Sequence, residues 1–188
     1  MIRRFAAVLS LVATGLAVLL LRDIDAGAAE PVRPAEPALA GVDEHYARMM
    51  VVHHEQAVEM SRTLIGKGDV PERVRLIAEF IARDQQREID LTNEWLTAWG
   101  RPSAGPVDVG AEHGMLTAAQ LGELDRADAR TAPAVFLRLM IEHHRGAIIM
   151  SRSWLDSGGG NAYVRSMARH VINEQTAEND AMAALLAP

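Results

Sequence analysis

MMVVHHEQAVEMSR, which spans residues 49–62, returns as LMIEHHRGAIIMSR at residues 139–152, so the two copies are offset by 90 positions. The pairs that match without a gap in this region are Arg48/Arg138, Met50/Met140, His53/His143, His54/His144, Ala57/Ala147, Met60/Met150, Ser61/Ser151 and Arg62/Arg152. Further along, the same offset relates Val74/Val164, Arg75/Arg165, Ala78/Ala168, Gln85/Gln175 and Glu88/Glu178. An internal repeat of this kind indicates two copies of one structural unit. The copies agree best at His and Met, which are potential metal ligands.

Apolar residues recur at helical spacing through most of the chain, and no segment alternates as a strand would. On the first predicted helix, at about 100° per residue, Met50 and His53 fall on one apolar face and His54 lies beside it. The long helices are predicted at about residues 43–65, 69–99, 131–157 and 161–187. The sequence therefore predicts an all-α fold, an antiparallel four-helix bundle built from two helical hairpins, which are the repeat halves 43–99 and 131–187.

Capping residues mark several of the expected helix ends. Asp43 is the predicted N-cap of the first long helix, and Asn161 is the predicted N-cap of the last. Thr117 with Gln120 forms a capping box for a short helix that ends near Arg126.

The N-terminal segment has the layout of an export signal. A short basic segment, residues 1–4, precedes a mostly apolar run at residues 5–21. Uncut, this run of 17 residues is at the lower limit for spanning a bilayer. Residues 1–28 are thus either a signal peptide or a signal anchor, residues 29–42 are a flexible linker, and residues 43–188 form the bundle domain. Either alternative places the bundle outside the cytoplasm, as a secreted or periplasmic protein or one attached to the outer face of the cell membrane.

Composition limits the classes of function that remain. The formal net charge of −6 and the pI of about 5.6 give no electrostatic basis for binding nucleic acid. Cysteine is absent, which excludes disulfides, thiol nucleophiles and thiolate metal sites. No Gly-x-Ser-x-Gly motif, Gly-rich phosphate loop or Cys-x-x-Cys-His motif indicates other chemistry.

Each repeat half supplies Met, His, His and Met at spacings i, i+3, i+4 and i+10 on one helix. Thioether sulfur is a soft ligand that favours Cu(I), whereas imidazole suits copper, zinc, iron or nickel. A set of Met and His without Cys in an exported protein therefore points to copper first. Glu88 and Glu178, on the partner helices, can fix the imidazole tautomers or ligate directly. In the loop between the halves, His113 and Met115 offer a third pair of ligands.

Other interpretations of these residues stay open. Core histidines are often satisfied by hydrogen bonds and Met is a common core filler, so the protein could be a metal-free interaction module. A di-iron oxidoreductase needs Glu-x-x-His on two helices, yet the residues three before the four histidines are Met50, Val51, Met140 and Ile141. Haem held by His and Met is a further alternative. The repetition favours metal binding, because four His, two Gln and two Glu facing one interior exceed what a stability-driven core carries.

The doubled HH-x-x-A-x-x-M, each copy followed by Q-x-x-E, resembles the domain-of-unknown-function 305 family from about Asp43 to Leu186. The resemblance implies a ferritin-like four-helix bundle that is usually exported, and it links some members to copper binding and copper tolerance. Carried over by position, the signature residues are Met50, His53, His54, Met60, Gln85, Glu88, His113, Met115, Met140, His143, His144, Met150, Gln175, Glu178 and Met182. Thr92 departs from the pattern, because the family often has Met there, as Met182 is in the second half. We therefore expect the first-half site to be one sulfur poorer.

The combined expectation is a non-enzymatic, extracytoplasmic copper-binding protein that sequesters the metal or hands it on. Cu(I) is favoured over Cu(II), and other transition metals remain alternatives. The residues predicted to hold the metal are Met50, His53, His54, Met60, Glu88, His113, Met115, Met140, His143, His144, Met150, Glu178 and Met182. The expected partner is the metal ion, with no nucleic acid and with membrane anchoring by the N-terminal segment left open.

Overall fold

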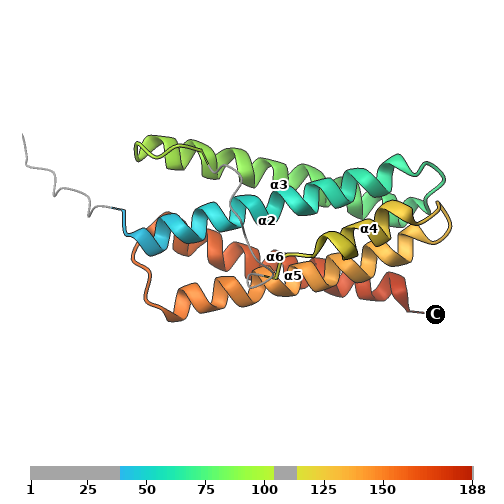
Figure 1. The fold of residues 1–188 in the computed structure, drawn as a ribbon. Helices are drawn as coiled ribbons and strands as arrows, with labels where there is room; N and C mark the ends of the chain where they lie inside the picture. The colour runs from blue at the N-terminus through green and yellow to red at the C-terminus, as the bar shows by residue number, and fades with distance from the viewer. Residues whose placement is uncertain (1–38, 104–113, 188) are drawn as a thin grey trace, which may run out of the picture. The chain divides into compact units, whose positions relative to one another are not determined.

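The computed structural model describes residues 39–103 and 114–187, and within these ranges it contains helices and no strand (Figure 1). In chain order the helices are α2 (Gly41–Gly66), α3 (Glu72–Ala98), α4 (Ala118–Arg126), α5 (Ala132–Asp156) and α6 (Ala162–Leu186). The all-α prediction is confirmed, and the four long helices begin and end within a few residues of the expected positions. The predicted signal segment, residues 1–28, lies outside the described residues, as does most of the predicted linker.

The four long helices form two antiparallel hairpins that pack together as a bundle (Figure 1). Helix α2 pairs most extensively with α3, and α5 pairs most extensively with α6. The two hairpins meet chiefly through α2 and α5, and the short helix α4 packs against both. Helices α2 and α5 run antiparallel, because Tyr46 near the start of α2 contacts Ser151 near the end of α5, with 2.7 Å between the hydroxyl oxygens. The predicted four-helix bundle is therefore confirmed.

Two of the predicted caps are present. The Asn161 side chain accepts hydrogen bonds from the backbone N–H groups of Tyr163 and Val164 at the start of α6. Thr117 and Gln120 form the reciprocal capping box that begins α4. These side chains satisfy N–H groups that have no partner within the first turn of a helix.

The prediction for Asp43 was wrong. Helix α2 begins earlier, at Gly41, and Asp43 lies buried in its first turn. The Asp43 carboxylate instead accepts a hydrogen bond of 3.2 Å from the backbone N–H of Asn161, in the turn between α5 and α6. This long-range bond joins the first turn of one hairpin to the connection of the other, so a residue expected to act locally serves the tertiary structure.

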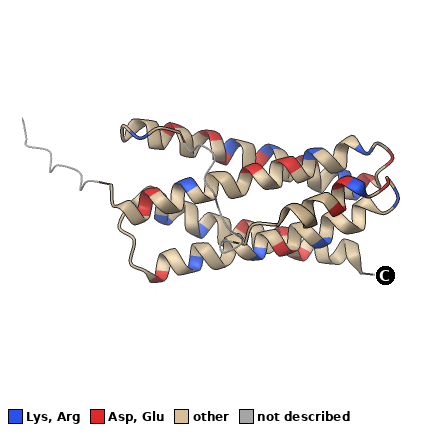
Figure 2. Cartoon of the chain, viewed as in Figure 1, with Lys and Arg blue, Asp and Glu red and all other residues tan. Residues whose placement is uncertain are grey.

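Charged residues of both signs are interspersed along the helices, as Figure 2 shows. Several form exposed or half-buried ion pairs, such as Arg75 with Glu79 and Arg138 with Glu123. Exposed pairs of this kind contribute at most about 1 kcal/mol each. None of the helices in residues 39–103 and 114–187 has the length and apolar character needed to cross a bilayer.

The apolar core contains two large clusters and a small third one, formed by Val51, Val58 and Ile89. One of the large clusters contains Met60, Met140 and Met182 together with Leu64 and Phe136. The other contains residues nearer the start of α2 and the end of α5. These include Tyr46, Met50, Ala147, Trp154 and Val171. Burying each large side chain contributes about 1.5–3 kcal/mol relative to exposure, so the clusters supply much of the driving force that holds the hairpins together.

The segment that follows the undescribed residues 104–113 is held against both hairpins. The Gln56 side chain of α2 donates to the Leu116 carbonyl at 3.1 Å and accepts from the Leu116 N–H at 2.8 Å. Gly114, with φ of +77°, packs directly on Gly146 of α5, where a Cβ on either glycine would meet the backbone of the other. Gln56 and Gly146 occupy equivalent positions at the 90-residue offset. The two halves thus hold one segment in different ways, one by hydrogen bonds and one by close backbone contact.

We expect Gly146→Ala to destabilise the protein, although Ala is normally about 1 kcal/mol better than Gly inside a helix. The new Cβ would lie 2.4 Å from the Gly114 Cα, so the segment must move. Overpacking of this kind costs roughly 1–3 kcal/mol. Urea unfolding of the variant measures the loss, and Gly66→Ala is the control because a Cβ there meets nothing within 4 Å. A Gly146→Ala variant as stable as the control would contradict the close contact.

Candidate metal centre

Four histidines meet inside the bundle where α2 crosses α5. His53 and His54 come from α2, and His143 and His144 come from α5. All four are at most 1% exposed. The rings of His53 and His143 contact each other in a tilted arrangement, with centroids 3.7 Å apart and planes 35° from parallel. Both halves of the sequence thus contribute buried histidines to one interior.

A glutamate from the neighbouring helix contacts the second histidine of each half. His144 Nε2 is hydrogen-bonded to Glu178 Oε2 at 2.7 Å, and His54 Nε2 lies 2.7 Å from Glu88 Oε2. An ionised carboxylate can only accept, so the hydrogen bond at His144 places the proton on Nε2 and leaves the Nδ1 lone pair available to a metal. Within residues 39–103 and 114–187, neither Nδ1 atom has a hydrogen-bond partner.

The surroundings keep the interior groups in the protonation states that bind metal. Burial lowers the pKa of His143 well below its ordinary value, and the nearby charges of His53, His144 and His54 lower it further. Burial alone would raise the pKa of Glu88, but contact with His54 and the charges of neighbouring histidines bring the net pKa below its ordinary value. At neutral pH the His143 imidazole is therefore neutral and Glu88 is ionised, and these are the forms that act as ligands.

Polar atoms of two glutamines also lie in this interior. Both amide atoms of Gln85 and Oε1 of Gln175 are buried and make no hydrogen bond to the described part of the chain. Buried polar groups in proteins nearly always have a partner, whether protein, water or ion. These amide atoms and the Nδ1 atoms of His54 and His144 are therefore available to bind a metal ion or another polar ligand.

Methionines lie on both sides of the histidines. Met60, Met140 and Met182 belong to one apolar cluster, and Met50, with Met150 at its edge, belongs to the other. All but Met150 are at most 1% exposed, and Met150 is half-buried. The three-methionine side therefore combines residues from both sequence halves, because the antiparallel crossing brings the end of one motif to the start of the other.

The two ligands predicted in the connecting segment differ in how far the structure describes them. Met115 is half-buried in the segment held by Gln56 and Gly146. His113 falls outside the described residues.

A sulfur atom from α6 lies beside the position at which the first half lacks one. Thr92 stands where the second half has Met182, and its hydroxyl donates a hydrogen bond of 3.5 Å to Met167 Sδ. Met167, on α6, therefore places a thioether beside the residue that lacks one. A search for repeated residues missed Met167 because its counterpart at the 90-residue offset is Ile77. Its place on the apolar face of α6 was the signal that could have found it.

His170, which the repeat did not select, also contacts a residue of the centre. Its side chain is 53% exposed, yet its Nε2 lies 2.9 Å from Glu88 Oε1. Glu88 thus contacts His54 with one oxygen and His170 with the other. The sequence places His170 beside the inward face of α6, and only the packing of α6 on α3 shows which residue it meets.

With this geometry established, comparison with known proteins identifies the family. The model of the domain of unknown function DUF305 matches residues 43–186. The chain belongs to the DUF305 family. No curated protein matches it.

Solved structures agree with this assignment. A DUF305 fragment from Deinococcus radiodurans superposes with a TM-score of 0.73 at 27% identity, covering 80% of this chain and 98% of that one. A predicted secreted DUF305 protein from Streptomyces coelicolor gives a TM-score of 0.69 at 34% identity, with coverages of 77% and 90%. CopM in its Cu(I)-bound form gives 0.61 at 26% identity, with coverages of 76% and 94%. The predicted family and its ferritin-like helical bundle are thereby confirmed.

The buried imidazole predicts how stability depends on pH. An unfolded chain protonates His143 near the ordinary pKa of about 6.5, whereas the folded chain does so only at much lower pH. Stability due to the neutral ring is therefore complete above about pH 6.5 and is lost as the pH falls toward the lower folded pKa.

We expect His143→Leu to reduce this dependence in the metal-free protein. Below about pH 6.5, the free energy of unfolding should fall less steeply than in wild type, by up to about 1.4 kcal/mol per pH unit, which is the value of one proton. Urea unfolding at several pH values, in the presence of a chelator, measures the two slopes. Equal slopes would mean that folding does not hinder protonation of His143.

Proposed function

We propose that the protein binds copper outside the cytoplasm and either sequesters the ion or hands it on, using the interior His and Met residues. The observation that supports this most strongly is the contact between the His53 and His143 rings, flanked by two further buried imidazoles that each meet a glutamate. Burial of four imidazoles is costly for a core that only needs stability, because each ring brings polar atoms that need partners. A metal ion supplies such partners.

The chemistry of the donors favours copper in its reduced state. Neutral imidazoles and thioethers are good ligands for Cu(I), whereas thioethers are weak ligands for harder divalent ions. The related CopM has been solved with Cu(I), with Cu(II) and with silver bound. Copper is the cargo in this proposal, and no catalytic step is assigned to it.

The proposed ligands combine the sequence prediction with the packing. Glu88 and Glu178 orient the histidines they contact, and the methionines supply sulfur from both sides. The residues proposed to hold copper are Met50, His53, His54, Met60, Met140, His143, His144, Met150 and Met182, with His113 and Met115 as ligands from the connecting segment. Met167 is added on the side of Thr92, where its sulfur already accepts a hydrogen bond.

Export of the protein is part of the proposal. The basic residues 1–4 and the apolar run 5–21 have the layout of an export signal. The similar protein from Streptomyces coelicolor is itself a predicted secreted protein. Mass spectrometry of the protein from the cell envelope and medium would distinguish a cleaved signal from a retained anchor, and recovery from the cytoplasm alone would contradict export.

The methionines provide the sharpest test of copper and its oxidation state. Replacing Met50, Met60, Met140 and Met150 together by Leu nearly preserves volume, and each such exchange typically costs under about 1.5 kcal/mol. Cu(I) affinity should fall much further than Cu(II) affinity, because Cu(II) can rely on His and Glu. Competition titrations with Cu(I) and Cu(II) chelators on the full-length chain measure both affinities.

Two single exchanges accompany this test, and one of them is its matched control. Met49→Leu makes the same exchange at a buried methionine outside the proposed ligand set and should leave Cu(I) affinity unchanged. Met182→Leu should weaken Cu(I) binding. Equal losses for both oxidation states in the fourfold variant, or no loss, would mean that the methionines only pack the core.

The histidines give a separate prediction. His53→Ala and His143→Ala should each lower the affinity for copper by at least about tenfold. Removing only a residue that orients a metal ligand already lowers affinity by about that much, so removing a ligand should cost no less. Circular dichroism should show little loss of helix, because each variant leaves the apolar clusters on both sides intact. Wild-type copper affinity in both variants would show that the rings are structural and would refute the proposed centre.

A further inference from the structure

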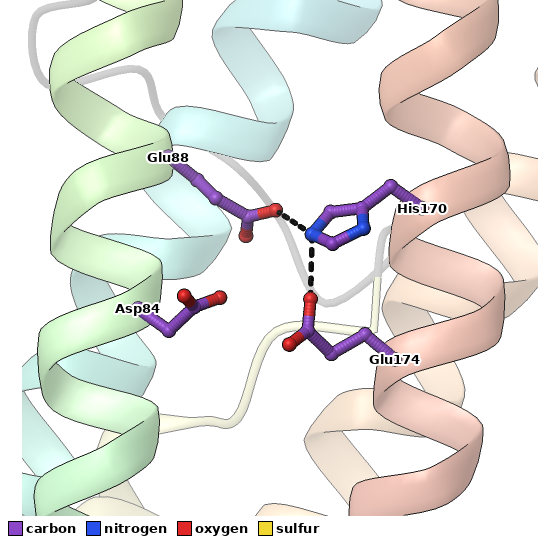
Figure 3. A group of neighbouring side chains, drawn as sticks. All are labelled: Asp84, Glu88, His170 and Glu174. Atoms are coloured by element: carbon purple, nitrogen blue, oxygen red, sulfur yellow. Dashed lines mark ion pairs between the residues drawn. The ribbon is translucent and has the colours of Figure 1, made fainter.

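A second group of metal-ligating side chains lies between α3 and α6, beside the interior centre (Figure 3). We call its four members the α3–α6 cluster: Asp84 and Glu88 from α3, and His170 and Glu174 from α6. Within each pair the residues are four apart, so each helix presents both side chains on one face. One nitrogen or oxygen atom from each residue lies within 4.8 Å of the others. The spacing suits a single small ion.

Two carboxylates converge on one nitrogen of this cluster. His170 Nε2 lies 2.9 Å from Glu88 Oε1 and 2.5 Å from Glu174 Oε2 (Figure 3). One imidazole N–H carries one proton, so it cannot donate a short, straight hydrogen bond to both oxygens. A metal ion among these atoms would bind the nitrogen and the oxygens together, which one proton cannot do.

The cluster also carries an excess of negative charge. Three carboxylates surround one imidazole, and no Lys or Arg of the described residues forms an ion pair with any of them. Burial raises the pKa of Glu174, and the charges of Asp84, Glu88 and Glu178 raise it further against the opposing effect of His170. Like charges held this closely repel one another, and either a proton or a bound cation relieves the repulsion.

An ion can reach the cluster without opening the bundle. A hollow of about 290 Å³ lies beside it and is lined by Asp84, Glu88 and His170, together with Tyr163 and Met167. The His170 side chain is 53% exposed and Glu174 is 25% exposed, in contrast to the interior histidines. The cluster is therefore open to solvent, whereas the interior centre is buried. Glu88 contacts residues of both.

We propose that the α3–α6 cluster is a second metal site, which takes a divalent transition-metal ion such as Zn(II) through one imidazole nitrogen and carboxylate oxygens. It contains no sulfur, so its donors suit borderline divalent ions and disfavour Cu(I). The internal repeat provides no twin of this site, because Phe80 stands at the position equivalent to His170. The proposal does not depend on copper binding in the interior.

The first test is a Zn(II) competition titration against a chromophoric chelator, using the full-length chain freed of metal. His170→Phe is the informative variant, because the first half carries Phe at the equivalent position and Phe80 is itself 39% exposed there. In this variant the affinity of the cluster for Zn(II) should fall by at least about tenfold, and Glu174→Gln should lower the same affinity. His45→Phe, which makes the same exchange at another exposed histidine, should keep wild-type Zn(II) affinity.

The second arm separates this site from the interior centre. The double variant His53→Leu/His143→Leu should still bind Zn(II) at the α3–α6 cluster, whereas His170→Phe should not. His170→Phe should bind Cu(I) with wild-type affinity. Zn(II) binding that is unaffected by His170→Phe and Glu174→Gln, or that is lost equally in the interior double variant, would overturn the second site. A wild-type chain that binds no Cu(I) would refute the copper proposal alone and leave the Zn(II) result standing.

Discussion

The contact between His53 and His143, with ring centroids 3.7 Å apart, is the constraint on which the arrangement of the bundle depends. Charged imidazoles cannot be buried this closely, because each would pay for desolvation and repel the other. The pair is compatible with burial only if at least one ring is neutral, and burial keeps His143 in that form. The adjacent His54 and His144 contact Glu88 of α3 and Glu178 of α6, so the interior combines side chains from both hairpins.

Much of this arrangement could be predicted from sequence because two independent periods agree. The helical period places His53 on an apolar face, and the 90-residue offset makes His143 its equivalent, so two packed hairpins bring the residues together. The Gln-x-x-Glu pattern on the next helix likewise predicted the glutamate contacts. Asp43 shows where local reasoning fails, because a short carboxylate near a helix start can serve its own helix or a distant N–H. The sequence predicts the helix start at Asn161 but does not show that this turn lies beside Asp43.

The residues that were missed are those in which the halves differ. Met167 and His170 are paired at the offset with Ile77 and Phe80, so the repetition that selected the other candidate residues argued against these two. Their partners, Thr92 and Glu88, lie on α3, more than seventy residues earlier in the chain. Only the packing of α6 on α3 brings them together. A search for repeated residues finds the functional side chains that both halves share. It does not find side chains that are present in only one half.

Glu88 and Glu178 illustrate how equivalent positions acquire different properties. Both contact a buried histidine at 2.7 Å, but Glu88 also places its second oxygen near His170. The charges of His54, His170 and His144 together lower the pKa of Glu88 below its ordinary value despite burial. A change in charge at His170, whether from a proton or a metal ion, acts on the same carboxylate that orients His54. The two halves of the interior therefore differ in electrostatics as well as in sulfur content, and a ligand entering this interior meets an asymmetric site despite the repeated sequence.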